Sequence, residues 1–311
     1  MTRPVARLAA DQERGTDRWR ALAARWAQPA LVGIAIAYGV VLWAMFVTDP
    51  HAGWDAHVYW SASLANPYAS SVAGVPGAYL YSPAFRQLIE PLTLLSWPLF
   101  HAIWEALLIG LLIALTGPFA IFLLANPIVA FELQAGNIHV LLATAIVLGF
   151  RYPAAWAFVL LTKVTPGVGV LWFVVRREWR NVGLVILGTL VVVGASFVLA
   201  PGLWVQWLQT LVHNATIPAG DYTGGIGGPL WLRGIIAIAI VTWGGLTDRR
   251  WTVPLAATIA IPLLALYNFT LLVAVVPLVL PQAGRFIRRW LPTGSSRGTP
   301  ASVPEAQPVL R

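Results

Sequence analysis

The sequence predicts an all-α protein, a bundle of about eight to ten helices that cross a membrane. Its 311 residues are 58% hydrophobic and only 10% charged, with a mean hydropathy of +0.73, whereas soluble domains carry roughly 25% charged residues. So few charges cannot cover the surface of a water-soluble protein of this length. The 16 Trp and 23 Pro fit the same class, because Trp favours the membrane surface and Pro is tolerated in membrane helices.

The charge pattern predicts an orientation and excludes some partners. The net charge is +8, and the basic residues lie mostly at the two ends of the chain and in short gaps between apolar segments. Cytoplasmic loops of membrane proteins carry this excess, so we expect no nucleic-acid partner. The absence of cysteine excludes disulfides, thiol catalysis and zinc–thiolate sites.

Three regions follow from this pattern. Residues 1–28 are expected to be a cytoplasmic Arg-rich tail, since they lack the apolar core of a signal peptide. Residues 29–284 form the transmembrane domain, and residues 285–311 a basic, disordered cytoplasmic tail. The expected location is the bacterial plasma membrane, as a multi-pass protein with a cytoplasmic N-terminus.

The first expected span, residues 29–47, is long enough to cross about 30 Å of hydrocarbon. Residues 49–86 then form a long extracytoplasmic loop, and loops of this length usually carry function. A second polar loop is expected at 201–229, and residues 252–281 are expected to form two short, kinked helices. The other apolar segments are 87–100, 102–117, 118–131, 138–150, 153–175, 182–200 and 230–246.

The first loop holds the strongest catalytic candidate, Asp55. It lies in the stretch Gly-Trp-Asp-Ala-His-Val-Tyr-Trp, and a carboxylate shielded by aromatic rings and lipid can act as a base toward a hydroxyl. His57 and Tyr59 are candidate substrate contacts in the same stretch. The alternative is a solvated loop carboxylate or a helix cap.

A divalent metal is a further possibility for this stretch. Asp49, His51, Asp55 and His57 are all potential ligands. No other segment supplies a ligand to complete the shell, so we expect neither a metal nor another cofactor.

Lys163 is the only lysine of the chain, and it lies inside an apolar segment. An ionisable group in such a position indicates function by default. The Thr-Pro-Gly at 165–167 should break the helix and expose backbone donors, so an ammonium beside them could bind phosphate. The alternative is a lysine that extends to the membrane surface.

Four further residues are candidate substrate contacts. Asn137 and His139 belong to a polar cluster that opens the apolar segment at 138, where they could line a sugar pocket or form a turn and helix cap. Arg86 and Arg233 lie where an outer loop meets a span. Each could bind a substrate phosphate or the headgroup of a membrane lipid.

The order of these motifs resembles glycosyltransferase family 87, membrane-embedded enzymes of the C-type glycosyltransferase architecture. The resemblance covers about residues 30–280. It is carried by Asp55 with Val58-Tyr59, Tyr81-Ser82-Pro83-Ala84-Phe85, Asn126-Pro127, Gly136-Asn137-Ile138-His139 and Lys163-Val164-Thr165-Pro166. A late Ser-Pro-x-x-Trp and histidine of the family are reduced here to Ile261-Pro262 and Tyr267-Asn268.

The resemblance implies a catalytic Asp in the first outer loop, matched by Asp55, and a polyprenyl-phosphate sugar donor used on the outer face. The expected reaction transfers a hexose, with mannose favoured, to a lipid or glycan acceptor. Asn268 is a further candidate substrate contact. The alternative is a non-catalytic membrane protein for transport or assembly of lipid-linked glycans.

Overall fold

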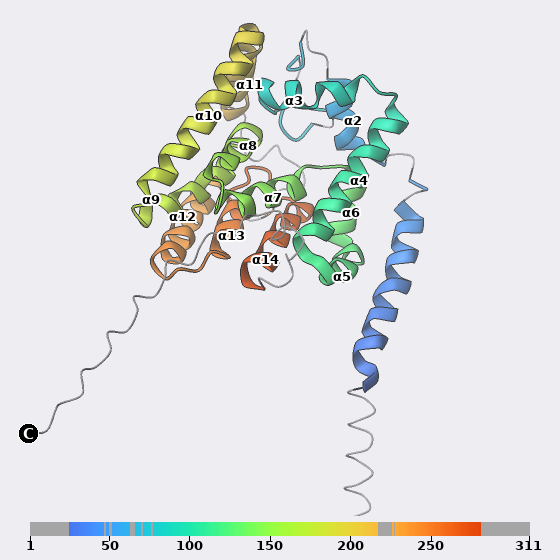
Figure 1. Ribbon diagram of the computed structural model, residues 1–311. Helices are drawn as coiled ribbons and strands as arrows, with labels where there is room; N and C mark the ends of the chain where they lie inside the picture. The colour runs from blue at the N-terminus through green and yellow to red at the C-terminus, as the bar shows by residue number, and fades with distance from the viewer. Residues whose placement is uncertain are drawn as a thin grey trace, which may run out of the picture.

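The computed structural model describes residues 25–280, except 47, 50–51, 63–65, 70, 76, 217–225 and 227. These residues form helices and turns without any strand (Figure 1), which confirms the predicted all-α membrane bundle. The predictions for the two tails fall largely outside the described residues.

Three helices are long and apolar enough to cross a membrane: Arg25–Phe46, Trp97–Leu124 and Trp179–Leu199. A bent pair, Pro127–Ala135 with His139–Gly149, raises the number to four if it is one span. The described residues therefore contain fewer full-length spans than the eight to ten expected. The difference arises because several apolar segments break into short helices.

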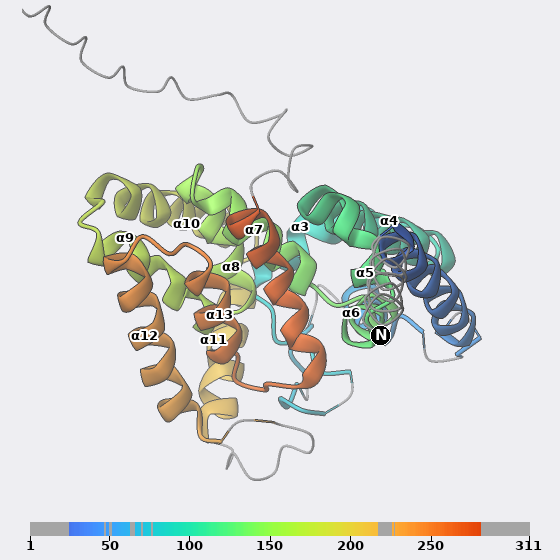
Figure 2. The same cartoon turned by 90° about the horizontal axis from the view of Figure 1, so that it is seen from below.

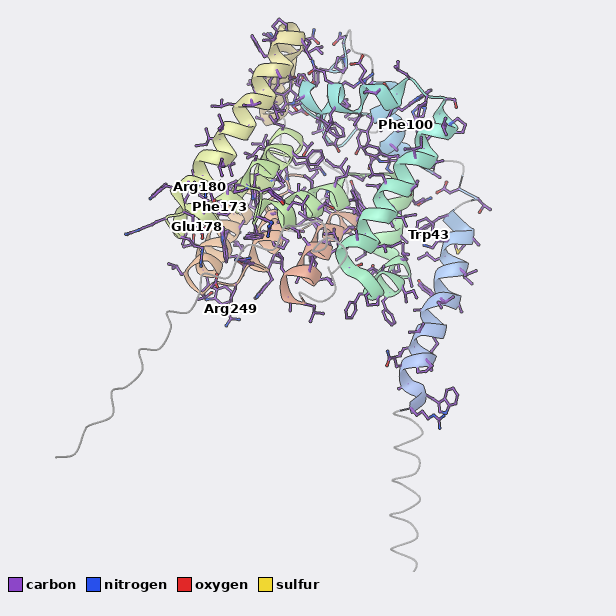
Figure 3. The ribbon with its side chains drawn as sticks, viewed as in Figure 1. Trp43, Phe100, Phe173, Glu178, Arg180 and Arg249 are labelled. Carbon is purple, nitrogen blue, oxygen red and sulfur yellow. The ribbon has the colours of Figure 1, made fainter. Side chains whose placement is uncertain are left out.

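The N-terminal helix Arg25–Phe46 stands at the edge of the bundle, and Trp43 lies within this helix (Figure 3). The Trp43 indole donates a hydrogen bond to the Leu124 carbonyl (3.1 Å). That carbonyl ends α5 (Ala120–Leu124), which follows α4 (Trp97–Thr116) and the short turn η1 (Gly117–Phe119). This helix therefore packs on the bundle from outside.

The sharpest break separates α6 (Pro127–Ala135) from α7 (His139–Gly149), whose axes differ by 104°. The Asn126 side chain caps α6 by accepting the Ile128 N–H (2.9 Å), and Pro at the first position favours the start of a helix. Gly136 ends α6 in the left-handed conformation, with φ +69°, a conformation that glycine adopts most readily. The bend therefore depends on a capped start and a glycine end.

The break predicted around Lys163 is confirmed. After the turn η2 (Pro153–Ala155), α8 (Trp156–Thr162) ends at Lys163, whose backbone is extended. The chain continues as η3 (Thr165–Val170) and α9 (Leu171–Val175). Pro166 cannot continue the helix of α8, since it lacks an N–H.

The prediction of a polar loop over 201–229 is wrong for its first half. After α10 (Trp179–Leu199), residues Pro201–Thr216 form the helix α11. The segment is amphipathic: Trp204 and Trp207 are buried, whereas Gln206 and Gln209 alternate with them at helical spacing. Mean polarity suggested a loop, but the periodicity favours a helix.

The C-terminal part forms short helices, as predicted for residues 252–281. After α12 (Leu230–Leu246) come α13 (Thr252–Ile259), η5 (Leu266–Ala274) and α14 (Val275–Val279). Figure 2 shows η5 and α14 running between α13 and α6. This places η5 beside the α6–α7 break.

Helices α2 (Trp54–Ser61) and α3 (Pro83–Thr93) lie at the same end of the molecule as α11 (Figure 1). The two Arg-rich turns, at residues 176–180 and 247–250, meet toward the other end of the molecule. There Arg176 forms an ion pair with Asp248 (2.9 Å). Helix α10 leads from these turns to α11, and its 21 residues span about 30 Å. The two ends are therefore separated by about the thickness of a membrane core.

Candidate active site

Helix α2 positions Asp55 over the break between α6 and α7. Gly53 begins α2 with φ +76° and donates its N–H to the Gln134 carbonyl of α6 (2.7 Å). Asp55 Oδ2 then accepts a hydrogen bond from Asn137 Nδ2 (2.6 Å). The Asn137 amide is fixed in this sense because its Oδ1 accepts the Ile138 N–H (2.7 Å).

The environment of Asp55 makes its carboxylate more basic. Burial and the negative charge of Glu132 raise the pKa of Asp55 from 3.8 to about 6, while the positive charge of Lys163 and the Asn137 hydrogen bond oppose the rise. Burial is the largest cause, because the charged form loses its hydration. The group is still ionised at neutral pH.

Two tyrosines, Tyr59 and Tyr81, extend the hydrogen-bond network around Asn137. Tyr59 lies one turn after Asp55 in α2 and is 1% exposed. Its hydroxyl donates to Asn137 Oδ1 (3.4 Å) and contacts the Tyr81 hydroxyl (3.0 Å). The Asn137 side chain is thus hydrogen-bonded to Asp55, Tyr59 and the Ile138 N–H, and these bonds fix its orientation.

Beneath Asn137, three ionisable groups form a buried chain. His139 Nδ1 lies 2.8 Å from Glu132 Oε1, and the His139 backbone N–H donates to the same oxygen (2.9 Å). Lys163 Nζ lies 2.7 Å from His139 Nε2. Since an ammonium can only donate, Nε2 is the acceptor and the proton of the neutral imidazole is on Nδ1.

Asn268 of η5 completes the chain. Its Oδ1 accepts the Ala265 N–H (2.5 Å), so its Nδ2 faces His139 Nε2 (2.9 Å) as a donor. This supports the same histidine tautomer. The site is therefore built from four separate segments: α2, the α6–α7 break, the α8–η3 break and η5.

Such a cluster brings a carboxylate and an ammonium to the same region of a membrane bundle. The family comparison decides its class. The family model of glycosyltransferase family 87 matches residues 79–291. The chain belongs to this family. It is therefore a membrane glycosyltransferase, and its reaction uses a sugar donor and an acceptor.

The match includes Asn137, His139, Lys163 and Asn268 of the transferase, whereas Asp55 precedes it. No curated protein and no solved structure matches the chain. The link between Asp55 and the family region therefore comes from the Asn137 hydrogen bond.

Among the predicted substrate contacts, His57 is outside the network. Its ring packs against Trp97 (centroids 4.8 Å apart) and Trp60 (5.4 Å) on the exposed side of α2. Asp55 and His57 point to different sides of the helix. The described residues contain no group of three His, Asp or Glu side chains arranged for a metal, and His51 lies outside those residues.

Arg86 is a buried cation with an unused donor. It is 6% exposed, and its Nε donates to the Ala62 carbonyl at the end of α2 (2.8 Å). Its Nη1 is buried without a hydrogen-bond partner among the described residues. Such a group is suited to an anionic ligand.

Arg233 has a different arrangement. Its guanidinium donates to four carbonyls, those of Gly228, Ile259, Ile261 and Pro262. Four of its five N–H groups are thereby used. Arg233 thus fixes the turn that leads into η5.

Sequence reasoning did not assign a site role to Glu132 or Tyr81. Glu132 is fully buried and partners His139, and the signal for it was an acid inside an apolar segment, seven residues before a histidine. Tyr81 gave no signal beyond its place in the family motif. Gln134 likewise emerges as a partner of Asp49, donating from Nε2 (2.7 Å).

Proposed function

We propose that this transferase moves a hexose, with mannose as first candidate, from a polyprenyl-phosphate sugar to a hydroxyl of a lipid or glycan acceptor. The observation that carries the proposal is the position of Asp55: a partly buried carboxylate, held by Asn137 and close enough to Lys163 to be affected by its charge. A base and a cation are the two groups that this reaction requires.

Asp55 acts as the base in this proposal. The acceptor oxygen attacks the anomeric carbon, and its proton passes to the Asp55 carboxylate. A pKa of about 6 makes Asp55 a stronger base than an ordinary carboxylate, yet leaves it ionised at pH 7.

The bond from the anomeric carbon to the phosphate oxygen breaks as the new glycosidic bond forms. The electron pair stays with polyprenyl phosphate, which leaves as an anion and needs no proton. It does need positive potential, because negative charge develops on the phosphate. Lys163 has ammonium protons beyond the one that faces His139, and Arg86 has its free Nη1.

The reaction is proposed to occur on the outer face. Asn214 of α11 donates to the Ser71 carbonyl (2.9 Å) and accepts the Ala73 N–H (2.5 Å), so the loop after α2 is attached to α11. That end lies opposite the Arg-rich turns joined by Arg176 and Asp248. Arg-rich loops favour the cytoplasm.

The Asp55→Asn variant tests the function. The amide keeps the shape and can still accept from Asn137, but it cannot take a proton. We expect hexose transfer from a polyprenyl-phosphate donor to fall roughly 10²- to 10⁴-fold. Asp248→Asn, an exposed carboxylate in the Arg-rich turn, is the matched control and should retain activity.

Near-parental turnover by Asp55→Asn would remove Asp55 as the base. If instead the parent protein itself transferred no hexose from any polyprenyl-phosphate donor, the chain would fit the non-catalytic alternative, in transport or assembly of lipid-linked glycans.

A further inference from the structure

A cavity of about 480 Å³ lies between the first outer loop and α11, outside the network of Asp55 and Lys163. Its volume is within the range of ligand-binding pockets, roughly 300–1,000 Å³. It is lined by Asn66, Tyr68, Ser71, Val72, Gln206, Gln209, Thr210 and His213.

The lining is polar but carries no fixed charge. The lining consists of three side-chain amides, three hydroxyls and one imidazole, and Val72 is its single aliphatic residue. Amides and hydroxyls both donate and accept hydrogen bonds, as do the hydroxyls of a sugar. A phosphate or carboxylate would find no Lys or Arg among these residues, so the lining favours a neutral ligand.

One lining group has an unmet hydrogen-bond requirement. The side-chain oxygen of Gln206 is buried and has no partner within the described part of the chain. A buried acceptor without a partner costs free energy, and rotation of the Gln206 amide toward a ligand hydroxyl in the cavity would remove that cost. Gln206, Gln209, Thr210 and His213 follow one another at helical spacing, so a single face of α11 presents them.

The walls are fixed in advance of any ligand. Asn214 joins α11 to the loop through Ser71 and Ala73. The Ser71 hydroxyl in turn accepts the Tyr79 N–H (3.1 Å). A preformed site of this kind avoids part of the ordering cost of binding.

The cavity is also connected to the proposed base. Its Tyr68 donates to the Tyr81 carbonyl (2.9 Å), and the Tyr81 hydroxyl contacts that of Tyr59, one turn from Asp55. The cavity wall is therefore linked through Tyr81 and Tyr59 to the helix that carries Asp55.

We propose that this cavity binds the neutral glycan part of the acceptor and so selects which hydroxyl reaches Asp55. The inference rests on the proposed transferase function and assigns the acceptor class to a site separate from the donor phosphate. Gln206 is the specificity-determining residue of this site.

The test measures binding in the inactive Asp55→Asn protein in detergent, by saturation-transfer NMR and calorimetry. The probes are mannotriose, maltotriose and a uronic-acid trisaccharide of the same length. We expect at least one neutral trisaccharide to bind, and the uronic-acid trisaccharide to bind at least tenfold more weakly.

Gln206→Met removes the unpartnered oxygen while keeping side-chain length, so we expect at least tenfold weaker binding with an unchanged or higher Tm. A merely structural role for Gln206 would instead lower Tm. Thr210→Trp, which fills the cavity, should also abolish binding. Val205→Met, on the exposed face of α11, is the control and should bind like the parent.

In the active protein, Gln206→Met should raise the acceptor KM at least tenfold and leave the donor KM unchanged. Failure of both neutral trisaccharides to bind, or parental binding by Gln206→Met, would overturn the inference. These results are independent of turnover, so they are distinguishable from failure of Asp55 as the base, which only the transfer assay of Asp55→Asn reports.

Discussion

Asp55 differs from a surface carboxylate by its burial and by the fixed hydrogen bond from Asn137. If its carboxylate is the base, kcat/KM should fall about tenfold per pH unit below about 6 and level off above it. Transfer rates at low donor and acceptor concentration, between pH 4.5 and 8, measure this profile. A rate that is constant from pH 4.5 to 7 would contradict it.

The same pKa has a consequence for stability. Because the folded protein binds the Asp55 proton more tightly than the unfolded chain, ionisation destabilises the fold. This loss of stability is absent below about pH 3.8 and grows until about pH 6. Above that pH it is complete and amounts to at most about 3 kcal/mol. Asp55→Asn should therefore have a higher Tm than the parent at pH 7 and an equal one near pH 4, measured in detergent. A lower Tm at pH 7 would show that the carboxylate is structurally needed.

Among the elements, the α6–α7 bend sets the site, and Gly136 sets the bend. A Cβ at Gly136 would lie 2.5 Å from that of Ala56 in α2, in addition to the strain of φ +69°. Gly136→Ala should therefore destabilise the protein by about 1–3 kcal/mol and reduce transfer, because α2 must move with Asp55. Thermal unfolding and the transfer assay measure both.

Two variants sharpen this prediction. Ala56→Gly should restore part of the activity of Gly136→Ala, since it removes the contact but not the backbone strain. Gly110→Ala, where an added Cβ meets nothing within 4 Å, should be silent. Loss of activity in Gly110→Ala would point to a general sensitivity of the bundle.

The buried chain of Lys163, His139 and Glu132 joins two broken helices. Lys163→Met removes the charged donor to His139 Nε2 and the positive charge that stabilises the Glu132 carboxylate, which should cost about 1–3 kcal/mol. Adding Glu132→Gln should recover most of the Tm, while transfer stays low because the cation near the phosphate is still missing. Recovery of activity together with stability would make Lys163 a structural residue only.

At the scale of the whole molecule, the proposed orientation can be tested directly, since the chain has no cysteine. Cysteine introduced at Ala69 in the first outer loop should react with a membrane-impermeant maleimide in intact cells. Cysteine at Thr247 in the Arg-rich turn should react only after permeabilisation. The reverse pattern would place the site in the cytoplasm.

The bundle illustrates which features follow from local patterns. The spans Arg25–Phe46 and Trp179–Leu199, the break after Lys163 and the short helices near 252–281 depend on hydropathy, Pro and Gly, and they were predictable. The span Trp97–Leu124 was instead expected as separate apolar segments. The helix α11 was missed because its polar stripe was taken for a loop. The direction of the second helix of a bent pair, such as α7, cannot be predicted from sequence, because it depends on packing against other helices.

By itself the sequence determined the membrane class and the family motifs, and it singled out Asp55 and Lys163 as candidates, because rare charges in an apolar chain are conspicuous. Only the tertiary structure decided that Asp55 meets Asn137, that His139 meets Lys163 and Asn268, and that Arg233 holds a turn. These partners are far apart in the chain, up to 129 residues for His139 and Asn268. Contacts over such distances are set by the packing of whole helices, and no local pattern encodes them.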